Sequence, residues 1–109
     1  MICVTVFQDS ERQTTGLECR GHAGFGEEGQ DIICAAVSAL TLNMANSVES
    51  FTHDPFAGEV DEESGGFSFY FTGAVSKESR LLMDSLVLGL TQIQESYGNE
   101  YITIGFKEV

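Results

Sequence analysis

The residues of this chain best suited to nucleophilic chemistry are its three cysteines. Cys3 and Cys19 fall at apolar positions of predicted strands, where a free thiol usually acts as a small hydrophobic side chain. Cys34 instead falls near the third residue of a predicted helix, directly after a glycine-rich segment. The field at a helix N-terminus lowers the pKa of a thiol and so raises its thiolate fraction. Cys34 is therefore the candidate nucleophile.

A thiolate nucleophile works with a general base, and the chain offers only His22 and His53 for that role. His53 follows the far end of the Cys34 helix, about 19 residues or roughly 28 Å along its axis, which puts it out of reach. His22 lies at the end of a predicted strand, and a short loop can bring it within hydrogen-bond distance of Cys34. The alternative that stays open is an exposed His22 and an unrelated, buried Cys34.

A zinc site is a rival use of the same atoms, because Cys19, His22 and Cys34 would supply three ligands. Residues three apart in a strand point to opposite faces of a sheet, however, so Cys19 and His22 cannot easily share a metal. We therefore expect neither a metal nor a cofactor.

The segment before the Cys34 helix is rich in glycine between residues 21 and 30. It resembles a phosphate-binding loop only superficially, because Glu27 and Glu28 would repel an anion and no lysine stands where such a loop needs one. Flexibility toward an approaching chain is the better interpretation. Asp31 is the natural N-cap of the helix, and its negative charge would oppose the effect of the helix N-terminus on Cys34.

The spacing of apolar residues predicts the elements that must position these side chains. Alternating residues predict five strands, the first two forming a β-hairpin, and a helical period predicts two helices, the second capped by Ser76. The expected strands are 2–7, 17–22, 56–60, 67–72 and 101–106, and the expected helices are 32–51 and 76–97.

Each predicted element has an apolar side that needs a partner. Two helices covering one face of a mixed sheet bury both helical stripes, so we expect an α+β fold of order ββαββαβ in a single domain, residues 1–109. The residues expected to face the core include Ile33, Val37, Leu40, Met44, Val48 and Phe51, then Phe67, Phe69 and Phe71, then Leu82, Leu86, Leu90, Ile93 and Tyr97, and finally Ile102, Ile104 and Phe106.

Composition narrows the class of protein. Hydrophobic residues make up 42% of the 109 residues, as in an ordinary packed domain. A formal net charge of -12 would repel phosphate backbones and anionic membranes, so we expect neither nucleic acid nor membrane as a partner.

The N-terminus does not resemble a secretory signal, and the apolar stretches 32–42 and 81–90 are shorter than a membrane span. Three cysteines without such a signal predict reduced thiols in the cytoplasm.

Two blocks of the sequence stand out as a motif, Gly21-His22-Ala23 and Gly29-Gln30-Asp31-Ile32-Ile33-Cys34-Ala35-Ala36-Val37-Ser38-Ala39-Leu40. With these blocks the chain resembles one known family, the bacterial ribosomal-processing cysteine proteases (Prp). The resemblance implies a homodimeric, cytoplasmic thiol protease of ribosome biogenesis, a hydrolase that removes a short N-terminal extension from the twenty-seventh protein of the large ribosomal subunit. Such proteases cut after a hydrophobic stretch that contains paired phenylalanines.

Carried over residue by residue, the resemblance makes Cys34 the nucleophile and His22 its general base. Asp31 and Ser38 match motif positions whose roles stay open. Asp31 would either orient His22 or cap the helix, and Ser38 would either line the pocket or bond back to a backbone carbonyl. Phe25 would either contact an apolar side chain of the substrate or pack on its own domain.

Two other functions use the same residues. A non-catalytic module would bind a ribosomal protein or an assembly factor in the same cleft without turnover, although a binder has no need for both His22 and Cys34. A redox sensor would use Cys34 alone, but no obvious resolving thiol lies nearby in the sequence.

Overall fold

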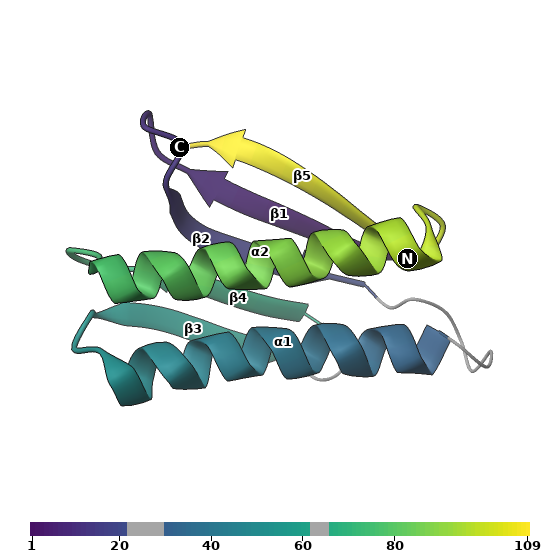
Figure 1. Cartoon of the computed structure of the whole chain (residues 1–109), viewed down its shortest axis with the longest axis horizontal. Helices are drawn as coiled ribbons and strands as arrows, with labels where there is room; N and C mark the ends of the chain where they lie inside the picture. Colours follow the sequence, from purple (N-terminus) through teal and green to yellow (C-terminus); the bar gives the residue numbers. More distant parts are fainter. Residues whose placement is uncertain (22–29, 62–65) are drawn as a thin grey trace.

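In the part of the chain that the structure describes, five strands and two helices follow one another in the predicted ββαββαβ order (Figure 1). The computed structural model describes residues 1–21, 30–61 and 66–109, and only the backbone at residues 30 and 31. The elements are β1 (Ile2–Gln8), β2 (Thr14–Arg20), α1 (Gln30–Phe51), β3 (Phe56–Asp61), β4 (Gly66–Phe71), α2 (Lys77–Tyr97) and β5 (Ile102–Glu108).

The five strands form one mixed sheet in the order β3-β4-β2-β1-β5. Strands β1 and β5 run parallel, and the three other neighbouring pairs run antiparallel. The β1–β2 connection is a tight turn in which the Asp9 carboxylate accepts hydrogen bonds from the backbone N–H groups of Glu11 and Gln13, at 2.8 and 3.0 Å. The predicted first hairpin is thus confirmed, although β2 begins three residues earlier than Leu17.

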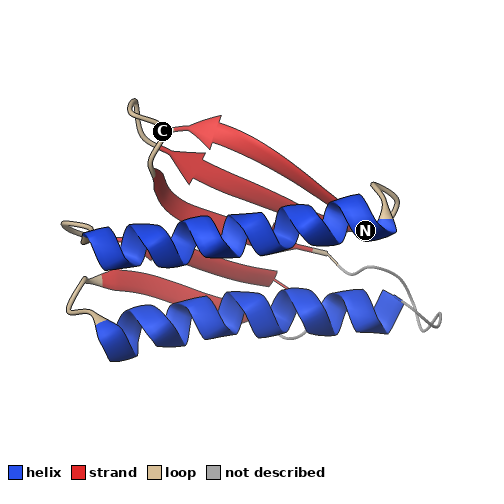
Figure 2. Ribbon diagram, viewed as in Figure 1, coloured by secondary structure: helices blue, strands red, loops and turns tan. Residues whose placement is uncertain are grey.

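Both helices cover the same face of the sheet, which confirms the predicted α+β architecture (Figure 2). The core lies between the two layers. The helices approach each other closely at Gly89, where a Cβ atom would lie 3.0 Å from Cδ1 of Leu40. The buried apolar residues are Ile2, Val4, Val6, Leu17, Cys19, Ile33, Val37, Met44, Val48, Phe69, Met83, Leu86, Leu90 and Ile102.

The start of α2 is tied to the end of α1 by a polar cluster. Ser76 is the N-cap of α2, as predicted, and its hydroxyl accepts a hydrogen bond from the Ser79 N–H at 3.2 Å. The Asp54 carboxylate, just past α1, accepts from the backbone N–H of Ser76 at 2.8 Å and from its hydroxyl at 2.6 Å. The far end of α2 stops at Gly98, whose φ of 99° suits glycine.

Three aromatic residues expected in the core are exposed instead. Phe51 is 77% exposed, Tyr97 53% and Phe106 58%. Phe51 and Tyr97 are the last residues of their helices and Phe106 lies on the edge strand β5, so fewer neighbouring elements cover them. On α2, the fully buried residues include Ser79 and Met83, which the sequence did not predict for the core.

Two further expectations are corrected. Helix α1 begins at Gln30, so Asp31 lies in its first turn rather than at its cap. The apolar period predicts only the part of the helix that contacts the core, and the helical backbone begins before that part.

By length and mean hydropathy alone (1.3), residues 32–51 are also long enough to cross a membrane, contrary to what we expected of the apolar stretches. In the structure Ile33, Val37, Met44 and Val48 from this helix join the core beneath the sheet.

Candidate active site

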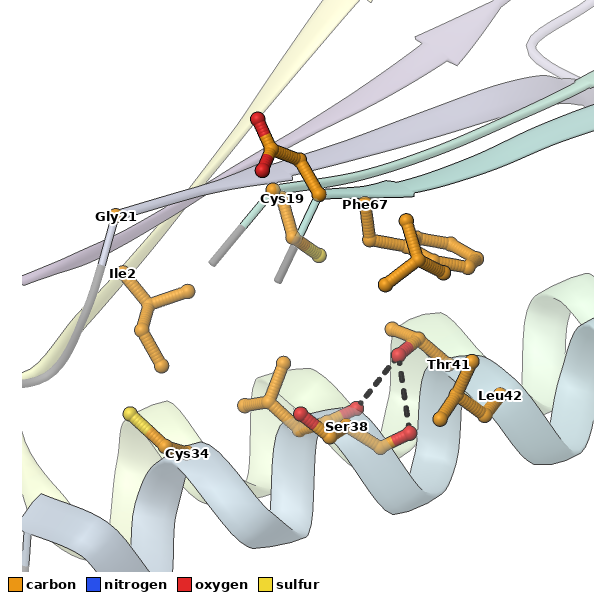
Figure 3. Close-up of a pocket in the computed structure, with 12 residues that line it drawn as sticks. Ile2, Cys19, Gly21, Cys34, Ser38, Thr41, Leu42 and Phe67 are labelled. Carbon is orange, nitrogen blue, oxygen red and sulfur yellow. Dashed lines mark hydrogen bonds between the residues drawn. The ribbon is translucent and has the colours of Figure 1, made fainter. Parts of the chain in front are cut away.

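A cavity of about 320 Å³ opens between the N-terminal half of α1 and the sheet (Figure 3). The helix forms one wall, and residues at the ends of β1, β2, β3 and β4 form the other. The lining residues from α1 are Cys34, Val37, Ser38, Thr41 and Leu42, and those from the sheet side are Ile2, Cys19, Gly21, Val60, Asp61, Gly66 and Phe67.

Cys34 lies near the N-terminal end of α1, as predicted, and its side chain is partly buried. Its side chain points across the cavity toward Ile2 (Figure 3). Because α1 begins at Gln30, Cys34 is the fifth helical residue rather than the third. The field of a helix N-terminus weakens beyond the first turn, and Cys34 lies just past that turn.

The other two thiols occupy environments that do not suit a nucleophile. Cys19 lines the same cavity, but it is only 3% exposed, and burial raises its pKa to about 12. It is therefore a thiol at neutral pH, in agreement with its predicted structural role. Cys3 is exposed rather than packed among apolar side chains, and it does not line the cavity. It alternates with Ile2 and Val4, which face the helices, and so lies on the uncovered face of the sheet.

Ser38 lies one helical turn after Cys34 and lines the cavity. Its place on the cavity wall fits the pocket-lining interpretation, and the role of Ser38 stays a prediction. Thr41 makes back bonds of this kind, from its hydroxyl to the carbonyls of Val37 at 2.9 Å and Ser38 at 3.2 Å.

Gly21 ends the first hairpin at the edge of the cavity and immediately precedes His22. Its φ is 85°, and a Cβ atom at this position would lie 2.5 Å from the carbonyl oxygen of Met1. Only glycine fits both conditions without strain. The predicted site residues His22, Ala23 and Phe25, and the side chain of Asp31, lie outside the described residues.

The other histidine is placed as expected. His53 is exposed and follows the C-terminal end of α1, whereas Cys34 lies near the N-terminal end of the same helix. Among the described residues, no group of three histidine, cysteine or acidic side chains could hold a metal ion. The zinc alternative also needs His22, which lies outside those residues.

Three residues of the cavity wall were not expected from the sequence: Leu42, Val60 and Phe67. Leu42 continues the row of Cys34 and Ser38 at a spacing of four residues, so helical periodicity could have identified it. Val60 and Phe67 could not be found in this way, because only the pairing of β3, β4 and β2 brings them to the cavity.

Comparisons with known proteins identify the family of this chain. The family model described as cysteine protease Prp matches residues 1–103. The ribosomal processing cysteine protease Prp of Staphylococcus aureus is 30% identical over 107 residues, covering 98% of this chain and all of that protein. The same-named protein of Bacillus subtilis is 30% identical over 101 residues, covering 89% and 90%.

Solved structures give the same result. The crystal structure of the S. aureus protease in complex with a covalently linked product peptide superposes with a TM-score of 0.88, at 30% identity, covering 98% of this chain and all of that one. The fold and site thus define a cysteine peptidase. This chain belongs to the cysteine protease Prp family.

Proposed function

We propose that this chain is an endopeptidase that removes the short N-terminal extension of a ribosomal protein, the twenty-seventh of the large subunit. The observation that carries the proposal is the partly buried thiol of Cys34 on the wall of a cavity of about 320 Å³. The relatives support it, because they are named ribosomal processing proteases and one is solved with a covalently linked product peptide.

The proposed reaction is acyl transfer to Cys34. Its thiolate attacks the carbonyl carbon of the scissile bond and forms a carbon–sulfur bond. His22 accepts the thiol proton and then donates it to the departing amine as the carbon–nitrogen bond breaks. Water, activated by His22, then hydrolyses the thioester and releases the product with the new carboxyl group.

Backbone N–H groups at the start of α1 would stabilise the oxyanion of the tetrahedral intermediate. The first N–H groups of a helix have no partner within it, whereas the N–H of a fifth helical residue bonds to the first carbonyl. The donors would therefore come from residues that precede Cys34, at residues 30–32, rather than from Cys34 itself.

The setting proposed for this reaction is a cytoplasmic homodimer that uses no metal and no cofactor. The peptide substrate is the free ribosomal protein, before it joins the ribosomal RNA. With 17 acidic and five basic residues, the enzyme attracts a basic protein and repels RNA.

Cleavage of the precursor tests the proposal directly. The wild-type chain is incubated under reducing conditions with precursor protein bearing the extension, and the product is identified by mass spectrometry. Cys34→Ala should abolish cleavage. Cys19→Ala, which changes a second thiol of the same cavity, should retain it. Binding of the precursor without cleavage by the wild-type chain would support the non-catalytic module instead, and cleavage by Cys34→Ala would exclude Cys34 as the nucleophile.

A further inference from the structure

The side chain of Cys34 faces the first residue of β1. Ile2 and Cys34 both line the cavity, and their side chains point toward one another (Figure 3). Cys34 is partly buried, and it packs against the buried core cluster to which Ile2 belongs. The proposed nucleophile therefore has an apolar neighbour that comes from the sheet rather than from its own helix.

Ile2 is anchored on several sides. Its backbone N–H donates a hydrogen bond to the carbonyl of Tyr101 at 2.8 Å, and it pairs with Ile102 in the parallel β1–β5 register. Only 4% of its surface is exposed. Because isoleucine is branched at Cβ, its χ1 angle is restricted as well. The side chain of Ile2 thus has a fixed position relative to the sheet.

The residue before Ile2 packs against the end of β2. A Cβ atom on Gly21 would lie 2.5 Å from the carbonyl oxygen of Met1, so the two backbones are in close contact. Gly21 immediately precedes His22, the proposed base. The start of β1 therefore contacts the strand end that leads to His22, and its first side chain faces Cys34.

The thiol of a helical cysteine has few positions available. Side chains occupy staggered rotamers, and the χ1 rotamer near +60° is rare in a helix because it clashes with the preceding turn. Two rotamers remain for Cys34, and contact with Ile2 favours the one that directs the sulfur atom toward the cavity. This choice matters for catalysis, because a displacement of about 1 Å at a reacting group can lower a rate about 100-fold.

We propose that Ile2 is a positioning residue, whose side chain holds the Cys34 thiol in the rotamer that attacks the scissile carbonyl. This role rests on the proposed function, because that function assigns the attack to Cys34. Ile2 acts through Cys34 rather than on the substrate. Shortening its side chain should therefore lower kcat and leave KM nearly unchanged.

Two matched substitutions test this role. Ile2→Val removes the methyl group at the end of the side chain. Ile102→Val makes the same change in the register partner of Ile2, which is fully buried and does not line the cavity. Both variants should lose a similar amount of stability. At a temperature where all the proteins are folded, Ile2→Val should lower kcat about 3- to 10-fold and Ile2→Ala about 10- to 100-fold, whereas Ile102→Val should retain the wild-type kcat.

A binding measurement distinguishes positioning from contact with the substrate. A fluorescent peptide that spans the junction of the precursor is titrated with Cys34→Ala, and with the same variant carrying Ile2→Val. The Kd values should agree within about twofold, because the methyl group that is removed faces the thiol.

Nuclear magnetic resonance tests the contact itself without turnover. In the wild-type chain with labelled isoleucine methyl groups, a nuclear Overhauser effect should connect the δ-methyl group of Ile2 with the β-hydrogens of Cys34. Its absence would overturn the positioning role, whether or not the chain cleaves the precursor.

The other outcomes divide in the same way. Equal kcat values for Ile2→Val and Ile102→Val would overturn the role, because the register partner would then matter as much as the residue that faces the thiol. Weaker peptide binding with an unchanged kcat would make Ile2 a substrate contact instead. A wild-type chain that shows the Overhauser effect but cleaves no precursor would contradict the proposed function, and the contact between Ile2 and Cys34 would then serve packing alone.

Discussion

At the scale of single residues, the extent of burial distinguishes two thiols that line the same cavity. Cys19 and Cys34 both line the cavity, but burial raises the pKa of Cys19 to about 12, whereas Cys34 is only partly buried. The sequence identified Cys34 from its place near a helix start. The sequence could not show that Cys19 is buried and Cys3 is exposed. Alternation defines two faces of a strand, but it does not show which face the helices cover.

Gly21 is the residue whose backbone directs the chain from β2 toward His22. Gly21→Ala should lower the free energy of unfolding by about 1 to 3 kcal/mol, because φ is positive and the new Cβ atom would meet the Met1 carbonyl oxygen. It should also lower kcat/KM at temperatures where the variant is folded, since His22 is the next residue. Urea denaturation and precursor cleavage measure the two effects.

The control for this substitution is Gly105 on β5. A Cβ atom there would have no neighbour within 4 Å, so Gly105→Ala should leave both stability and cleavage close to those of the wild type. Equal behaviour of Gly21→Ala and Gly105→Ala would show that the backbone at residue 21 does not require glycine.

At the scale of elements, the polar cluster at the other end of α1 fixes that helix to α2. The Ser76 hydroxyl, with further hydrogen bonds from Ser79 and the Ser76 N–H, lowers the pKa of Asp54 from its ordinary value of 3.8. A carboxyl group whose pKa is lower in the folded state stabilises the fold above its unfolded pKa. That contribution is lost as the pH falls through the lowered folded value.

Asp54→Asn should therefore lower the melting temperature at pH 7, because the amide is a weaker acceptor for the Ser76 N–H and hydroxyl than the carboxylate is. The difference from the wild type should shrink as the pH falls below about 4 and disappear once Asp54 is protonated in the folded wild type. Thermal denaturation of both proteins from pH 7 to pH 2.5 measures it. A difference that is constant with pH would show that the carboxylate charge does not contribute.

Ser76→Ala removes the helix cap of the same cluster. It should cost about 1 kcal/mol of stability, which is typical for the loss of an N-cap hydroxyl. Ser85→Ala, at an exposed position in the middle of α2, should cost nothing, because alanine is the better helix former. Denaturation with urea compares the two variants, and equal stabilities would show that Ser76 is not needed as a cap.

The sequence predicted the existence and order of all seven elements, because each has a clear apolar period and a stop signal such as Pro55 or Gly98. It could not predict strand order, since the β2–β4 and β1–β5 pairings join segments far apart in the chain. It also missed the buried Ser79, a polar residue whose hydroxyl donates to that of Thr52, at 3.4 Å. A period based on apolar residues cannot detect such a position.

At the scale of the whole molecule, the charge of -12 sets the field that an approaching substrate meets. If the substrate is a basic ribosomal protein, electrostatic attraction should raise the association rate at low salt. We predict that kcat/KM for the full precursor falls as sodium chloride rises from 20 to 500 mM, because salt screens this attraction. A short, uncharged peptide substrate should show little change. An equal response of both substrates would mean that the acidic surface does not steer the precursor.

The central proposal is that the Cys34 thiol gives its proton to the His22 imidazole. The most direct test is the pH dependence of Cys34 alkylation by iodoacetamide, measured with Cys3 and Cys19 replaced by serine and alanine, in the presence of His22 and in His22→Ala. The account predicts that alkylation of Cys34 at neutral pH is slower in His22→Ala than in the protein that retains His22, because the imidazole no longer accepts the thiol proton. Superimposable profiles for the two proteins would contradict it.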